Sequence, residues 1–344
     1  MYAVLGLIKR YWLMLVCIFL ICILVFFAGS FYFVAQLKAV DSEENMKVIV
    51  VDVKPNTSCR ELADNLEKKG LVRDSFIFNL YANYINMDIK IQPGEYELNT
   101  AMSAKEILQK LVSGEVICYS FTIPEGYNVE QVAEILEKEG YADKEKFLDL
   151  CKRGDLNFDF LAETSDVRYI LEGYLFPDTY MVTAYVTEEE IIEMMLKRFE
   201  LEMEVLDFEQ KARELGLSVH QAVTIASMIE REALIDSDRS IISSVIHNRL
   251  KRDMPLQIDA TVLYALGEHK EIVLYKDLEV ESPYNTYKVH TLPPGPIASP
   301  GSASLYAAIN PEKTEFLYYV LKPDGSHAFS RTYSEHLVNV SKYL

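Results

Sequence analysis

The sequence is poor in the features that mark several common classes of protein. Basic residues are outnumbered, with 34 Lys and Arg against 52 Asp and Glu, which gives a formal net charge of -18. Strong binding to a phosphate backbone needs clustered Lys and Arg, and no basic cluster is visible. This balance argues against a nucleic-acid-binding protein. The charge is better suited to keeping an exported domain soluble.

Motifs of metal and cofactor chemistry are also lacking. The chain has no HExxH, no GxSxG, no nucleotide-binding GK[ST] and no dinucleotide fingerprint, and its histidines are scattered without helical ligand spacing. We therefore expect neither a metal nor a cofactor. Of the five cysteines, two lie in an apolar segment, which leaves Cys59, Cys118 and Cys151. An odd number gives no disulfide framework, although one pair stays open.

A long uncharged segment lies near the amino end. Residues 11–37 contain no Asp, Glu, Lys or Arg, and as a helix they span about 40 Å, enough to cross a hydrocarbon core of about 30 Å. Lys9 and Arg10 precede the segment and acidic residues follow it. The positive-inside rule therefore predicts a cytoplasmic segment at 1–10, a single-pass transmembrane helix in the cell membrane and an extracytoplasmic remainder. A cleaved signal peptide ending near Ser30 is the alternative, but the apolar region is longer than such peptides usually have.

The rest of the chain is long enough for two or three domains after a linker at 38–46. Residues 47–118 alternate strand and helix patterns, and Ser58 and Ser103 are each followed three residues later by Glu, which indicates capped helix starts. Residues 119–344 then form a larger domain. The predicted fold class is α+β, with an N-terminal transmembrane helix, a small α/β module and a mixed α+β domain.

One helix of the larger domain carries the main catalytic candidate. Ser218, with Gln221 three residues later, predicts a helix start near Val219. Apolar residues then recur at three- and four-residue spacing, namely Ala222, Ile225, Ala226, Ile229 and Ala233. Glu230 borders this stripe, so we expect partial desolvation, which favours the protonated form that a general acid needs. Glu232 points to a different face if the helix continues, so we choose Glu230. A solvated border residue is the alternative for such a Glu.

Polar and aromatic residues flank this helix in three segments. Downstream, Gln257 and Asp259 precede a short helical run, and the alternative to a sugar contact at Asp259 is an N-cap. Further on, the sequence has Tyr284, Asn285, Thr286 and Tyr287. Their hydroxyls and amide can form hydrogen bonds with sugar hydroxyls, and their flat rings can stack on the apolar faces of sugars. Upstream, in EGYLFPDTY, Glu172 is a further polar candidate.

In order, the segments AVTIASMIERE, VIHNRL, LQIDATVLYALG and SPYNTYKVHTLPPGPIASPG resemble the endolytic murein transglycosylases of the MltG (YceG-like) family. EGYLFPDTY is similar to a second signature of that family, with Tyr174 and Tyr180 at positions where the family has Trp. The resemblance implies a LysM-like fold for 47–118, a fold associated with glycan binding. A spacer that lifts the catalytic domain off the membrane is the alternative for this module.

The resemblance also implies a reaction. By the family motif, Glu230 protonates the glycosidic oxygen between MurNAc and GlcNAc, and then, as a carboxylate, takes the proton of the sugar's own C6 hydroxyl. The product is a 1,6-anhydro-MurNAc end, and no water is consumed. Ordinary glycosidases need two carboxyl groups, and the sequence offers no well-placed second one.

The implied substrate is the peptidoglycan glycan strand. Cleavage within nascent strands serves cell wall assembly and glycan-length control, with peptidoglycan synthases as implied protein partners. A noncatalytic peptidoglycan-binding scaffold of the same fold is the alternative function.

Overall fold

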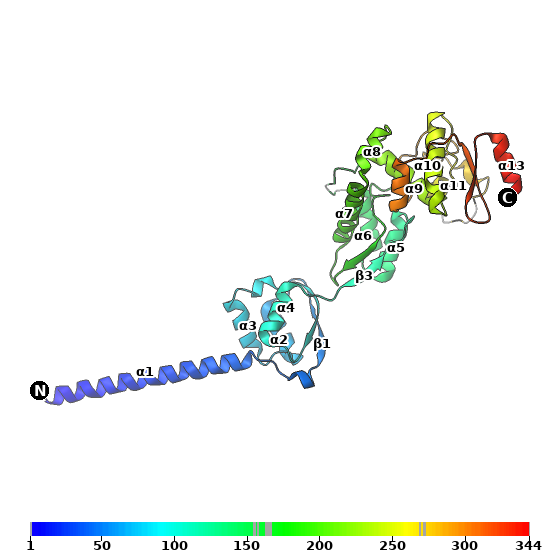
Figure 1. Ribbon diagram of the computed structural model, residues 1–344. Coiled ribbons are helices and arrows are strands. Elements are labelled where there is room, and N and C mark those ends of the chain that lie inside the picture. Colours follow the sequence, from blue (N-terminus) through cyan, green and yellow to red (C-terminus); the bar gives the residue numbers. More distant parts are fainter. Residues whose placement is uncertain are drawn as a thin grey trace. The chain divides into compact units, whose positions relative to one another are not determined.

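The computed structural model describes residues 2–153, 156, 158–161, 167–267, 270 and 273–343. The chain divides into two compact units (Figure 1). The first contains the residues up to Tyr119 together with Val182–Tyr185, and the second contains Ser120–Met181 and the residues from Val186 onward. Each unit has its own helices, strands and core.

The first unit begins with one long apolar helix, α1 (Tyr2–Gln36). Its segment Met14–Gln36 has a mean hydropathy of 2.9 and none of it is buried inside the protein. By length and composition this segment can cross a membrane. A signal sequence near the amino end would pass the same test.

The rest of the first unit is a two-stranded sheet covered by three α-helices. Its elements in chain order are η1 (Glu43–Asn45), β1 (Val48–Val53), α2 (Cys59–Lys68), α3 (Ser75–Tyr84), η2 (Asp88–Lys90), β2 (Gly94–Asn99) and α4 (Ala104–Ser113). The strands are antiparallel, from Val48 opposite Asn99 to Val53 opposite Gly94. The predicted caps are confirmed, because Ser58 accepts from the Glu61 amide and Ser103 forms a full capping box with Glu106. These caps fix where the helices begin.

The second unit is mainly helical, with two small sheets. Its elements are β3 (Tyr119–Thr122), α5 (Val129–Glu139), α6 (Lys144–Arg153), β4 (Thr179–Val182), α7 (Glu188–Leu206), α8 (Phe208–Glu214), α9 (Val219–Glu232), α10 (Asp236–Lys251), α11 (Asp259–Leu266), η3 (Asp277–Glu279), α12 (Ser302–Ile309), β5 (Tyr318–Leu321), β6 (His327–Ser330) and α13 (Tyr333–Tyr343). Strand β3 pairs with β4, and β5 pairs with β6. The α+β class is confirmed. The cysteines outside α1, Cys59, Cys118 and Cys151, are free thiols.

Helix α9 lies at the centre of the second unit. The predicted capping box of Ser218 and Gln221 is present, and the helix begins at Val219 as expected. Every residue from Ala222 to Ile229 is buried, and α9 packs against α8, α10, α11 and α12. Small alanine and serine side chains allow this close approach. The rigid surroundings hold the carboxyl end of α9, which carries both candidate glutamates.

Candidate functional site

Helix α9 continues through both glutamates and ends at its C-cap, Ala233. Two residues that are two positions apart on a helix are rotated about the helix axis by about 200° relative to each other. Glu230 and Glu232 therefore leave the helix on different faces, as the sequence predicted. Their surroundings differ in charge and in hydrogen-bond partners.

The Glu230 carboxylate is held inside the protein. Its Oε2 accepts a hydrogen bond from the Gly301 amide at 3.0 Å, and its Oε1 lies 3.3 Å from the Arg239 guanidinium. Only 7% of the Glu230 side chain and 11% of the Arg239 side chain are exposed. Gly301 is the N-cap of α12, where a negative charge is favourable. Glu230 thus ties α9 to α10 and α12 as a paired carboxylate.

A second carboxyl group lies beside this pair. A Cβ added to Gly301 would come within 1.9 Å of Glu125 Oε1, so the Glu125 carboxyl group rests on the Gly301 backbone. Burial and the negative charge of Glu230 raise the pKa of Glu125, against the opposing effect of Arg239. Sequence reasoning missed Glu125, because it lies in an irregular segment before the N-cap of α5 and carries no helical pattern.

Glu232 lies in a different environment. It is half-buried, and its Oε2 accepts a hydrogen bond from the Tyr319 hydroxyl at 2.8 Å. Burial and the nearby Asp259 charge raise the pKa of Glu232 to about 7, while the Tyr319 hydrogen bond and Arg231 act in the opposite direction. A carboxyl group with this pKa is present in both protonation states near neutral pH. General acid and base catalysis by one group needs that balance.

Three of the predicted substrate contacts come together on the Glu232 side. The Asp259 carboxylate accepts a hydrogen bond from the Tyr287 hydroxyl, and Asp259 is close enough to Glu232 to affect its pKa. Asp259 opens α11 without acting as its N-cap, which is Ile258. Gln257 has a positive φ of 53°, and its amide binds the Thr286 carbonyl at 3.0 Å. Gln257 and Asp259 are exposed and Tyr287 is half-buried, so a substrate can reach all three.

Arg249 holds together the segments around Glu232 through hydrogen bonds from its guanidinium. Its guanidinium donates to the carbonyls of Leu317 at 2.6 Å, Leu256 at 2.8 Å and Pro255 at 3.1 Å. These bonds join the end of α10 to the segment before Gln257 and to the start of β5. Sequence reasoning missed the role of Arg249, although this residue lies on the helix after α9 and within the VIHNRL segment. It also missed Tyr319, which comes from a strand remote from α9 in the chain.

Asn285 and Thr286 lie inside the protein. Both are fully buried. The Asn285 amide donates to the carbonyls of Leu278 at 2.8 Å and Val280 at 2.9 Å, and its oxygen accepts from the Tyr287 amide at 3.1 Å. The Thr286 hydroxyl accepts from the Ile258 amide at 2.9 Å. Their polar atoms are already engaged, so we assign these two residues to holding the loop that carries Tyr287.

Tyr284 and Glu172 are buried as well. Tyr284 is 5% exposed, and Glu172 is 2% exposed. Glu172 accepts hydrogen bonds from the Val129 amide at 3.1 Å and the Tyr264 hydroxyl at 2.9 Å. Burial raises the pKa of Glu172 to about 8. This carboxyl group joins α5 to α11 through these two hydrogen bonds, and the substrate contact expected of it stays a prediction.

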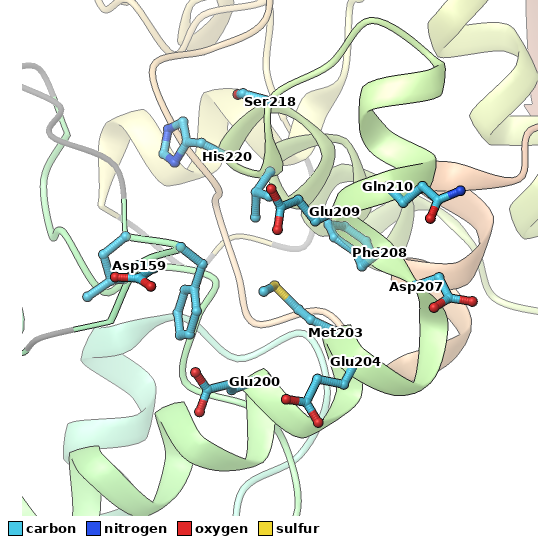
Figure 2. A pocket seen from close by; sticks show the side chains of 13 residues that line it. Asp159, Glu200, Met203, Glu204, Asp207, Phe208, Glu209, Gln210, Ser218 and His220 are labelled. Atoms are coloured by element: carbon cyan, nitrogen blue, oxygen red, sulfur yellow. The ribbon is translucent and has the colours of Figure 1, made fainter.

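A large cavity lies elsewhere in the second unit. It measures about 830 Å³ and is bordered by five carboxylate residues from three segments, Asp159, Glu200, Glu204, Asp207 and Glu209 (Figure 2). His220 also lines it, with its ring nitrogens engaged by the Tyr174 hydroxyl at 2.8 Å and the Pro294 carbonyl at 2.7 Å. Neither Glu230 nor Glu232 lines this cavity. A smaller cavity of about 380 Å³ adjoins α9 through Arg231 and extends between Gly126 and Leu263.

The family model of the YceG-like family matches residues 51–342. The chain belongs to this family. It is 36% identical over 330 residues to the endolytic murein transglycosylase of Bacillus subtilis (strain 168), covering 92% of this chain and 90% of that protein. It is 32% identical over 362 residues to the endolytic murein transglycosylase of Streptococcus pneumoniae (strain ATCC BAA-255 / R6), covering 95% of this chain and 65% of that protein.

A solved structure agrees with this assignment. The crystal structure of a YceG-like protein from Listeria monocytogenes, determined at 2.6 Å, has a TM-score of 0.58 with this chain at 36% sequence identity. The match covers 86% of this chain and all of that chain. The family resemblance drawn from the motifs is therefore confirmed.

Proposed function

We infer that this protein is an endolytic murein transglycosylase, which cuts within the glycan strands of peptidoglycan. Relatives of that name match over more than nine tenths of the chain. The observation that carries the catalytic assignment is the environment of Glu232. A carboxyl group whose pKa is raised to about 7 by burial and by Asp259 lies beside the exposed and half-buried polar residues that the family motifs singled out.

We propose Glu232 as the general acid and base. In its protonated form Glu232 gives its proton to the glycosidic oxygen, and the bond from that oxygen to C1 of MurNAc breaks. The resulting carboxylate takes the proton of the C6 hydroxyl as O6 bonds to C1. Glu232 ends the cycle protonated, GlcNAc leaves with a free hydroxyl, and MurNAc keeps a 1,6-anhydro ring. A pKa near 7 suits both halves of this cycle.

Polar groups around Glu232 support the same reaction. The Asp259 charge favours the protonated form of Glu232 in the free enzyme. The Asp259 carboxylate is also suited to stabilise the positive charge that develops at C1. Tyr319 holds Glu232 in one orientation through its hydroxyl. Gln257 and Tyr287 offer an amide and a ring for sugar contacts.

The position of Asp259 near Glu232 also suits an alternative reaction, hydrolysis. The sequence suggested no well-placed second carboxyl group, whereas Asp259 lies near Glu232. Two carboxyl groups are the equipment of a hydrolase, in which the second activates water or attacks C1. Hydrolysis would leave reducing MurNAc ends, and the transglycosylase reaction leaves 1,6-anhydro ends. We propose the second outcome because the relatives carry that name.

Glu230 remains the rival for the catalytic role. It matches the position chosen from the family motif, but its carboxylate is nearly enclosed and paired with Arg239. Both of its oxygens are engaged, Oε2 by the Gly301 amide and Oε1 by the Arg239 guanidinium. We therefore rank Glu232 first and keep both in the test.

We propose that α1 anchors the protein in the cell membrane with residues 1–10 in the cytoplasm. The apolar segment Met14–Gln36 and the two basic residues before it support this orientation. The module at 47–118 and the catalytic domain at 119–344 then lie outside, where they meet nascent glycan beside the synthases. Protease added to intact spheroplasts should remove both, and full protection would contradict the orientation.

The function is tested by digestion of peptidoglycan. Full-length protein in mild detergent is incubated with purified sacculi, and the soluble fragments are analysed by mass spectrometry. Internal cleavage with 1,6-anhydro-MurNAc ends is expected. Reducing ends would indicate a hydrolase, and binding to sacculi without any new ends would indicate the noncatalytic scaffold.

A further inference from the structure

The surface of the first unit has one helix face of unusual composition. Residues 75–87 contain no charged side chain, although a quarter of the whole sequence is charged. Helix α3 buries Ile77, Phe78 and Ala82, yet it also exposes apolar side chains. Phe76 is 71% exposed, Leu80 is 46% exposed and Tyr84 is 83% exposed. Since these three are spaced four apart, they form one stripe along α3.

Beyond the end of the helix, Ile89 is a further exposed apolar residue, with 83% of it exposed. We call Phe76, Leu80, Tyr84 and Ile89 the α3 face. The neighbouring helix α2 shows the ordinary pattern, because its outward side carries Arg60, Glu61, Asp64, Glu67 and Lys68. A continuous apolar stripe on one helix of a charged module marks an interaction surface.

The start of α3 is joined to the end of α1. Asp74, the N-cap of α3, accepts a hydrogen bond from the Tyr32 hydroxyl at 3.5 Å. Arg73 donates to the Ala39 carbonyl at 2.7 Å and 3.0 Å. The Leu37 carbonyl accepts from the Ala104 amide at 3.0 Å, and Leu37 packs on the core of the module. The end of α1 and the residues just after it are therefore joined to the residues that begin α3 and α4.

This junction sets the depth of α3 relative to a bilayer. Tyr32 lies one turn before Gln36, where the candidate membrane span ends. A tyrosine one turn inside the end of a span lies at the interface between hydrocarbon and headgroups. Asp74 contacts that tyrosine, so α3 begins at the same interface. An uncharged helix with aromatic and apolar side chains on its outer side suits this layer.

We propose that the α3 face rests in the headgroup layer of the membrane leaflet from which α1 emerges, so that lipid covers Phe76, Leu80, Tyr84 and Ile89. The proposal rests on the membrane anchor proposed above. Its occupant is lipid, because the face is continuous with the span through Tyr32 and Asp74. The contact would hold the module against the membrane and leave its charged side facing away.

The experiment uses fluorescence quenching by lipids that carry a spin label near the headgroup. The chain has a single tryptophan, Trp12, so a Trp12→Phe background accepts one reporter at a time. Tyr84→Trp probes the α3 face, and Val50→Trp, at a position of β1 that is 48% exposed, is the matched control in the same module. Full-length protein is reconstituted in vesicles of phosphatidylcholine and phosphatidylglycerol with labels in both leaflets.

Quenching of the Tyr84→Trp reporter should exceed that of the Val50→Trp reporter roughly twofold or more. Adding Tyr84→Glu to a Phe76→Trp reporter should weaken the quenching of the latter, because a charge is expelled from the layer. Trp12 in the parent chain reports the anchor separately. If Trp12 is quenched and the Tyr84→Trp reporter behaves like the control, the α3 proposal fails while the anchor stands. If Trp12 escapes quenching, the anchor itself fails.

Another occupant would also overturn the proposal. A second copy of the chain on the α3 face would shift the Tyr84→Trp emission to the blue without lipid quenching. That shift would grow with the ratio of protein to lipid. Lipid contact predicts quenching that is independent of this ratio.

Discussion

Glu230 and Glu232 lie two residues apart on α9 and meet opposite environments. Glu230 is enclosed, accepts the Gly301 amide and pairs with Arg239. Glu232 accepts one tyrosine hydroxyl and lies near the like charge of Asp259. The first carboxyl group is held by a backbone amide and a guanidinium, whereas burial and Asp259 raise the pKa of the second to about 7. Because 200° of helix rotation separates the two side chains, closeness in sequence gives no guide to shared chemistry.

The sharpest test of this comparison replaces each carboxyl group by an amide of the same shape. Glu232→Gln removes both proton transfers, each typically worth about a hundredfold to ten-thousandfold in rate, so release of anhydro ends should nearly cease. Glu230→Gln should keep most of its activity per folded molecule. The measurement is the rate of anhydro-MurNAc formation from sacculi, corrected for the folded fraction. An inactive, well-folded Glu230→Gln beside an active Glu232→Gln would return the catalytic role to Glu230.

The next largest effect concerns stability on the Glu230 side. Arg239→Gln leaves the enclosed Glu230 carboxylate without its guanidinium, and breaking a buried pair from one side costs about 3 kcal/mol or more. The free energy of unfolding should fall accordingly, as measured by urea denaturation. Arg213→Gln is the control, since Arg213 pairs with Glu209 while 75% and 65% of their side chains are exposed. Exposed pairs contribute about 0 to 1 kcal/mol. Equal losses for the two variants would show that Glu230 needs no charge partner.

Local signals in the sequence predicted the helix that carries both glutamates. The Ser218 and Gln221 capping box fixed the start of α9, and the helical spacing fixed its buried stripe. The divergence of the two glutamates followed from helix geometry alone. These inferences succeeded because each depends on residues within one or two turns.

The partners of the glutamates could not be predicted in the same way. Tyr319 comes from a strand 87 residues after Glu232, and Gly301 lies 71 residues after Glu230. Asn285 looks like a sugar contact in the sequence, yet its amide closes a loop on the Leu278 carbonyl. Only tertiary packing decides whether such a polar side chain faces solvent or the protein.

Asn285 offers a further test, because its loop carries Tyr287 to the Glu232 side. Asn285→Ala removes three hydrogen bonds, two of them part-buried bonds to the carbonyls of Leu278 and Val280. An unsatisfied buried group costs about 1 to 3 kcal/mol, so the melting temperature should fall clearly. Asn310→Ala, which loses one exposed bond to the Tyr306 carbonyl, should change it little. Unchanged melting with weaker glycan turnover would favour direct sugar binding by Asn285.

The smallest expected effect is a displacement of the pH profile. In the free enzyme Glu232 must be protonated to act as the acid, so kcat/KM should fall as pH rises through about 7. The Asp259 charge raises the pKa of Glu232, and its removal in Asp259→Asn should move this fall to lower pH. The Tyr319 hydroxyl stabilises the carboxylate and lowers the pKa, so Tyr319→Phe should move the fall to higher pH.

The opposite signs of these two shifts make the pH test specific. A variant that merely loosens the site would lower the rate at every pH and leave the midpoint in place. The other charged groups that face Glu232, Arg231 and Arg249, are intact in both variants. Profiles that move in the same direction, or that move only when Arg239 is replaced, would transfer the titrating group from the Glu232 side to the Glu230 side of α9.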